Sequence, residues 1–205
     1  ANRLGASALM QGLADGYFVL PYTIGDYLSD EISTGPIAND SEEFITAERE
    51  AKEKLDTLIN NNGSKSVDYF HKKLGKIMWN KCGMARNKMD LESAIDEISK
   101  LRKEFWKDVK VPGDQNEFNE ELAKAGRVAD FLELGELFAK DALEREESCG
   151  GHFREEYQTK EGEATRKKEF QFVSAWEYVG EPKNAILHKE KLEYENIEVK
   201  ERSYK

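Results

Sequence analysis

A regular spacing of apolar residues dominates the stretch between residues 118 and 148. Apolar side chains recur there at alternating steps of three and four, which is the period of one helix face. A second apolar stripe runs beside the first, so the predicted helix should contact more than one neighbour, as the central helix of a bundle does. The first stripe contains Leu122, Ala125, Ala129, Leu132, Ala139 and Leu143, and the second contains Val128, Phe131, Leu134, Phe138 and Ala142. Gly150 and Gly151 are expected to end this helix.

Three earlier stretches carry the same helical period and should supply the neighbours. The first begins at Asp40 or Ser41 and breaks at residues 60–63, the second starts at Ser66, and the third follows Met89. Their connections are short, which favours antiparallel packing. The predicted fold class is therefore all-α. We expect an up-and-down helical bundle over residues 41–149, spectrin-repeat-like and with a left-handed twist.

The two ends of the chain depart from this pattern. Residues 1–28 contain a predicted helix with many small residues that Pro21 ends, and residues 29–40 have the Gly-Pro and polar composition of a linker. Residues 150–205 form a C-terminal extension. Within it, residues 170–179 and 192–199 are rich in β-branched and aromatic residues, which predicts two short strands that could pair.

Composition and charge exclude several classes of function. Acidic residues outnumber basic ones by 41 to 31, giving a net charge of -10, so the chain lacks the basic surface that non-specific nucleic-acid binding requires. No apolar run approaches the roughly 20 residues of a membrane-spanning helix. Cys82 and Cys149 lack a CxxC spacing, and His71 and His188 have no partner at ligand spacing. We therefore expect no disulfide framework, no metal site and a soluble protein of a reducing compartment.

Two motifs give the chain a family resemblance. One is Asn2-Arg3-Leu4-Gly5-x-Ser7-x-Leu9 near the start, and the other is Arg145-x-Glu147-Ser148-Cys149-Gly150-Gly151-His152-x-Arg154 after the long helix. Both resemble segments of the flavoprotein subunit of succinate dehydrogenases and fumarate reductases. A weaker match in the family's helical C-terminal domain covers Met78-Trp79 and Gly83-Met84-Ala85-Arg86.

The resemblance implies roles for three residues near the start. Arg3 stands where the family's arginine binds a carboxylate of the C4 dicarboxylate, and a guanidinium can hold a carboxylate through two parallel hydrogen bonds. Ala8 and Leu9 stand at the family's Ser-Leu pair, whose backbone N–H groups meet the flavin. Ala8 departs from the usual serine, a change that a backbone contact survives. No catalytic residue is assigned within this chain.

At the helix exit the chain also departs from the family, because Cys149 replaces an arginine and Gly151 an alanine. His152 could titrate near neutral pH or donate to an active-site region. We instead expect His152 and Arg154 to hydrogen-bond backbone and carboxylate groups and so to fix the exit of the chain from the helix. Arg86 is expected to cap or pair at a helix end.

For the whole protein, the resemblance implies a flavoprotein that interconverts succinate and fumarate by hydride transfer with FAD and passes electrons to an iron-sulfur subunit. Residues 1–28 would be the tail end of its FAD-binding domain, and the fragment alone should be inactive. A membrane-anchor subunit would be reached through the iron-sulfur subunit, which implies a peripheral complex on the cytoplasmic side of the inner membrane. Two alternatives stay open: the C-terminal region of L-aspartate oxidase, whose motif usually reads Arg-Leu-Ala where this chain has Gly5, and a non-catalytic helical docking module.

Overall fold

The computed structural model describes residues 5–31, 35–114, 118–196 and 198, which belong to two compact units, residues 2–53 and 54–205. In the first unit, α1 (Gly5–Ala14), the π-helical turn η1 (Asp15–Val19) and α2 (Leu20–Tyr27) follow one another without a break. Large apolar side chains along this segment, such as Leu13 and Phe18, are exposed. The helix α3 (Glu42–Asn60) crosses from the first unit into the second.

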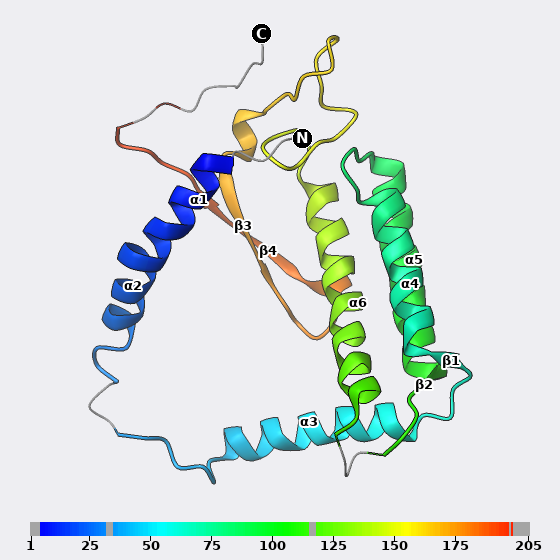
Figure 1. The fold of residues 1–205 in the computed structure, drawn as a ribbon. Coiled ribbons are helices and arrows are strands. Elements are labelled where there is room, and N and C mark those ends of the chain that lie inside the picture. Colours follow the sequence, from blue (N-terminus) through cyan, green and yellow to red (C-terminus); the bar gives the residue numbers. More distant parts are fainter. Residues whose placement is uncertain (1–4, 32–34, 115–117, 197, 199–205) are drawn as a thin grey trace. The chain divides into compact units, whose positions relative to one another are not determined.

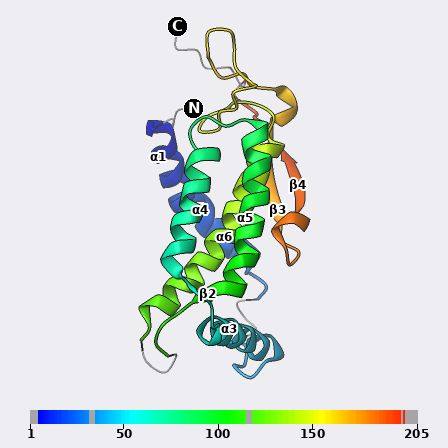
Figure 2. The same ribbon diagram turned by 90° about the vertical axis from the view of Figure 1, so that its right-hand side faces the viewer.

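The second unit is built on α4 (Val67–Lys81), α5 (Lys88–Asp108) and α6 (Glu120–Glu144), which pack on one another. Each of these helices runs antiparallel to the one before it in the chain (Figures 1 and 2). Each helix begins after a polar residue whose side-chain oxygen accepts a hydrogen bond from a first-turn N–H group. These N-caps are Ser66, Asn87 and Asn119. The short strands β1 (Lys65–Ser66) and β2 (Val109–Lys110) pair in parallel beside the start of α4 and the end of α5. The predicted helical bundle is thus confirmed.

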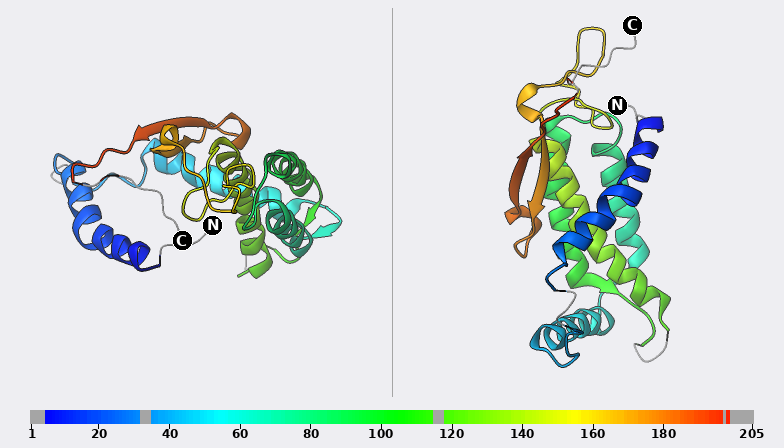
Figure 3. Two further views of the ribbon diagram at one scale, coloured as in Figure 1. Left: turned by 90° about the horizontal axis from the view of Figure 1, so that it is seen from above. Right: turned by 90° about the vertical axis from the view of Figure 1, so that its left-hand side faces the viewer.

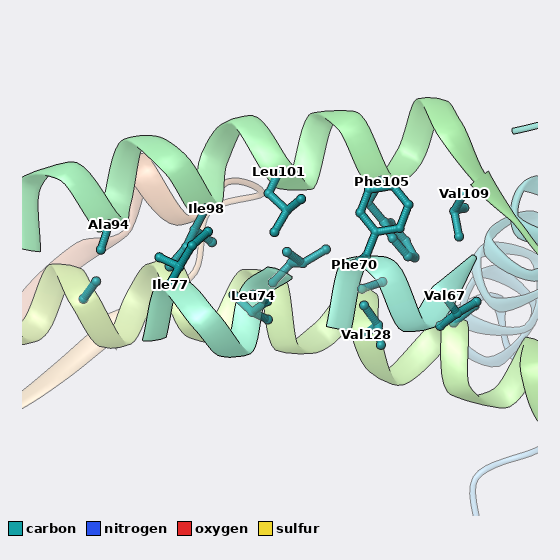
Figure 4. Close-up of a cluster of buried hydrophobic side chains, with 14 of the residues drawn as sticks. Val67, Phe70, Leu74, Ile77, Ala94, Ile98, Leu101, Phe105, Val109 and Val128 are labelled. Carbon is teal, nitrogen blue, oxygen red and sulfur yellow. The ribbon is translucent and has the colours of Figure 1, made fainter. Parts of the chain in front are cut away.

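The apolar core lies between these three helices (Figure 4). Its members follow the three-and-four spacing of the sequence, because that spacing places them on one face of each helix. The rings of Phe70 and Phe105 meet edge to face with their centroids 5.2 Å apart. Leu58 in the last turn of α3 joins the core, whereas Phe44 and Leu55 of the same helix are exposed.

The long helix α6 differs from the prediction in two ways. It ends at Glu144 rather than at residue 148, because Arg145 already has an extended backbone with ψ 94°. Its first apolar stripe is buried, but Phe131, Leu134 and Phe138 of the second stripe are exposed by 42%, 60% and 46%. The helices α4 and α5 therefore cover the first stripe, apart from the half-buried Leu143, and leave much of the second uncovered.

The C-terminal extension forms an antiparallel hairpin of β3 (Phe172–Glu177) and β4 (Ile186–Lys191), preceded by the 3-10 turn η3 (Lys168–Phe170). The first predicted strand corresponds to β3. The second prediction is wrong at residues 192–196, because the 3-10 turn η4 (Pro182–Asn184) returns the chain earlier and β4 ends at Lys191. Residues 197 and 199 of that prediction lie outside the described residues. The hairpin runs alongside α6 (Figures 1 and 3), where the indole N–H of Trp176 donates to Asp141 at 2.8 Å.

One ion network is buried between α5 and α6. Arg102 lies near three carboxylates, with Nε 3.5 Å from Glu136 and Nη1 3.7 Å from Glu133, and it also pairs with Glu181. Glu136 is only 1% exposed, and its two oxygens accept no hydrogen bond within the described part of the chain. Burial raises the pKa of Glu136, against the attraction of Arg102. Keeping Glu136 ionised in the folded state therefore lowers the free energy of unfolding.

This network makes stability depend on pH. Since the folded state raises the pKa of Glu136 above its ordinary value of 4.5, the folded chain binds the proton more tightly than the unfolded chain. The contribution of Glu136 to stability is therefore largest when it is protonated, and it falls as the pH rises from the ordinary pKa through the folded one. We expect Glu136→Gln to gain stability relative to the native chain across that window. Urea unfolding at several pH values measures this difference, and Glu190→Gln at an exposed position of β4 is the control. A pH-independent difference would contradict the assignment.

Candidate functional site

The residues predicted near the start of the chain are described only in part. Arg3 lies outside the described residues. Ala8 and Leu9 lie on α1, and both are exposed. Because α1 begins at Gly5, the N–H of Leu9 faces the carbonyl of Gly5 one turn earlier and is not one of the free donors at the helix start.

This geometry tests whether the residues fit a flavin. Exposed positions on α1 can meet a group outside the segment, but a contact through the N–H groups of Ala8 and Leu9 requires those donors to be free. The cofactor contact of Ala8 and Leu9 therefore stays a prediction, and we derive no chemical step from it.

The second motif forms a cluster at the exit from α6. Cys149 and His152 exchange two backbone hydrogen bonds of 2.8 and 3.0 Å around a turn in which Gly150 has φ 57°. Such a positive φ is easy for glycine, so Gly150 forms this turn and not the end of α6. The hydroxyl of Ser148 accepts a 2.8 Å hydrogen bond from the N–H of Arg154 and so fixes the segment of chain that follows the turn.

Arg154 is the centre of this cluster and is 1% exposed. Its Nη1 donates to the carbonyls of Ala142 and Leu143 at 2.9 and 3.1 Å, so the side chain caps the last turn of α6. Its Nε donates to Glu156 at 3.1 Å. The prediction that Arg154 bonds backbone and carboxylate groups to fix the chain exit is confirmed.

His152 joins the cluster to the end of α4. Its Nε2 lies 2.9 Å from the carbonyl of Arg145, and its Nδ1 lies 2.9 Å from Nη1 of Arg86. A carbonyl can only accept and a guanidinium can only donate, so these partners select the neutral imidazole with its proton on Nε2. Burial lowers the pKa of His152, and the charges of Arg86, Arg154 and Arg145 lower it further, against the opposing effect of the Arg145 carbonyl. This environment favours the same neutral form.

Arg86 brings the weaker middle motif into the same place. Its Nε donates to the carbonyls of Cys82 and Gly83, which caps α4 as predicted. Its backbone forms a bridge with Arg154, through Arg86 N to the carbonyl of Phe153 and Glu155 N to the carbonyl of Arg86. Both motifs were visible in the sequence, but the contact between Arg86 and Arg154 was not. The two residues are far apart along the chain, and no regular spacing of residues links them.

These contacts decide what the cluster can do. The hydrogen-bonding groups of His152 and Arg154 are engaged with the chain itself, which suits a structural role. The described residues contain no group of histidine, cysteine or acidic side chains that could hold a metal ion. In the same part of the chain, no helix combines the length and the apolar character that crossing a bilayer requires.

Comparison with known proteins identifies a family for most of this structure. Residues 71–204 match the family model described as "Fumarate reductase flavoprotein C-term". The chain is 27% identical over 157 residues to a fumarate reductase flavoprotein subunit of Haemophilus influenzae, covering 77% of this chain and 25% of that protein. It is 26% identical over 162 residues to a fumarate reductase flavoprotein subunit of Helicobacter pylori, covering 79% of this chain and 22% of that protein.

Solved structures agree on the fold. A quinol fumarate reductase of E. coli matches with a TM-score of 0.66 at 21% identity, covering 81% of this chain and 27% of that one. The apo Sdh1 complex of Mycobacterium smegmatis matches with a TM-score of 0.64 at 22% identity, covering 80% of this chain and 27% of that one. The chain thus spans about a quarter of the length of these relatives.

Proposed function

The chain belongs to the family of fumarate reductase flavoprotein C-terminal regions, and from this membership we propose that it is the C-terminal part of a flavoprotein that interconverts succinate and fumarate. The match over residues 71–204 carries the proposal. The named relatives are flavoprotein subunits of oxidoreductases, which supports FAD as the cofactor of the full-length protein. The match also favours this interpretation over a helical docking module without a catalytic parent.

Within the full protein, hydride transfer with FAD would oxidise succinate or reduce fumarate, and electrons would pass to an iron-sulfur subunit. That subunit would link the protein to a membrane anchor, as a peripheral member of a complex on the cytoplasmic side of the inner membrane. The bundle supplies a rigid body in this proposal, since its capped helices and buried core need no ligand to form their contacts. The isolated chain is proposed to be inactive.

Arg3 is the proposed substrate-binding residue, because its guanidinium can orient one carboxylate of the dicarboxylate. In the full-length protein we expect Arg3→Ala to lower kcat/KM for succinate by about 10- to 100-fold, the value of one hydrogen-bonded charged group. Succinate-driven dye reduction measures this, and exposed Arg127→Ala is the matched control. Unchanged turnover and unchanged dicarboxylate affinity would show that the assigned role is wrong.

A further inference from the structure

A cavity of about 370 Å³ lies at the exit from α6, beside the end of α4. Its walls include two guanidinium groups, one carboxylate and the imidazole described above. The lining residues used here are Arg86, Phe138, Asp141, Arg145, Cys149 and His152. The family match assigns no role to this cavity.

The charged groups of the wall differ in how they are paired. Arg145 forms a 2.9 Å ion pair with Glu147 and donates to the carbonyls of Phe170 and Phe172. The carboxylate of Asp141 accepts the indole N–H of Trp176. Arg86 donates only to two backbone carbonyls and to His152, and within the described part of the chain it forms no ion pair. Arg86 is therefore a half-buried cation without a counterion among those residues.

The position of Arg86 is fixed from three sides. Its Nε is held by the carbonyls at the end of α4, and its Nη1 by Nδ1 of His152. The ring of Phe138 lies 4.9 Å from Cζ and covers one face of the guanidinium. The N–H groups on Nη2 of Arg86, and the second one on Nη1, donate no hydrogen bond to the described residues. Together they form the edge of the guanidinium that can pair with a carboxylate through two hydrogen bonds.

We infer that this cavity binds a carboxylate group and that Arg86 is the residue that pairs with it. A guanidinium removed from water is costly unless an anion accompanies it, and the planar fork of arginine matches the two oxygens of a carboxylate. Because Arg145 is already paired with Glu147 and Asp141 already accepts from Trp176, Arg86 is the charged wall group left to meet the ligand. His152 acts as a positioning residue, because its hydrogen bond holds Nη1 in place. This inference does not depend on the proposed function.

The carboxylate could belong to a free dicarboxylate or to an acidic side chain or chain end of a protein, and one titration distinguishes them. The ring nitrogens of the three histidines are followed by NMR in the 205-residue chain while sodium acetate, succinate or sulfate is added at constant ionic strength. We expect saturable shifts at His152 with acetate and succinate, and none at His71 or His188. Succinate binding more than about 10-fold tighter than acetate would identify a free dicarboxylate, whereas equal affinities would show that the site recognises one carboxylate at a time, as a side chain or chain end presents it.

Matched variants make the test decisive. Arg86→Gln should abolish the shift at His152, Arg86→Lys should weaken acetate binding by about 10-fold because the fork is lost, and exposed Arg127→Gln should leave it unchanged. Unaltered His71 and His188 signals confirm that each variant is folded. The inference is overturned if chloride produces the same shifts as acetate, if the shifts persist in Arg86→Gln, or if sulfate binds more tightly than acetate. Should Arg86→Gln not fold, the native chain and Arg86→Lys decide the question by the same criteria.

Discussion

Replacing Arg154 by methionine is expected to lower the free energy of unfolding by about 3–5 kcal/mol. The methionine fills similar space but offers no donor, so the carbonyls of Ala142 and Leu143 at the end of α6 lose their cap. Glu156 also loses its ion pair with Arg154, although it keeps the hydrogen bond from the N–H of Lys88. Three hydrogen bonds from a charged donor are lost together, and each is worth roughly 1.5–3 kcal/mol, so a large effect is expected. Urea unfolding followed by circular dichroism measures it.

The matched control for this change lies on the same helix. Arg127 is exposed on α6, and Arg127→Met should alter the free energy of unfolding by no more than about 0.5 kcal/mol. If Arg154→Met were within about 1 kcal/mol of the native chain, the network around Arg154 would not hold the end of α6.

Gly63→Ala is expected to destabilise the bundle by about 3 kcal/mol, although only one methyl group is added. Gly63 lies in the connection between α3 and β1, where the backbone passes directly over the end of α5. An added Cβ would overlap the backbone carbonyl of Asp108 and would lie 2.5 Å from the carbonyl oxygen of Val109. Backbone atoms cannot rotate away as a side chain can, so the β1–β2 pairing must shift to make room. Thermal or urea unfolding gives the magnitude.

A second glycine separates this clash from the general effect of adding alanine. Gly126 is inside α6, and a Cβ built there meets nothing within 4 Å. Gly126→Ala should therefore stabilise the chain by roughly 0.5–1 kcal/mol, through the lower conformational entropy of the unfolded state and a higher helix propensity. Equal changes in the free energy of unfolding for the two substitutions would mean that the close approach at Gly63 does not affect stability.

The helices were predictable because their signal is local. Side chains at steps of three and four necessarily share a face, so Phe70, Leu74, Leu101 and Phe105 could be assigned to a core before their partners were known. The antiparallel order followed from the short connections. Arg154 was expected to bond backbone and carboxylate groups at the chain exit, but the sequence did not show that it caps the last turn of α6.

The remaining features depend on contacts that the sequence does not encode locally. The end of α6 at Glu144 follows from the cap by Arg154, whereas the Gly150-Gly151 pair suggested a later end. The strand β4 has little alternation, and its place is set by the turn η4 and by pairing with β3. No spacing rule indicates that Arg86 meets His152 or that Arg102 meets Glu136 across two helices.

The attachment of the hairpin has a consequence for how the chain opens. β3 and β4 pair only with each other among the described residues, and a two-stranded sheet by itself is marginally stable in water. Polar contacts at both of its ends attach it to the bundle: Lys140 donates to the carbonyls of Pro182, Lys183 and Ala185, Trp176 donates to Asp141, and Arg145 donates to the carbonyl of Phe172. The hairpin can therefore detach and close again while the helices remain folded. Its amide protons exchange with solvent through this local opening, whereas those of α5 and α6 require unfolding of the bundle.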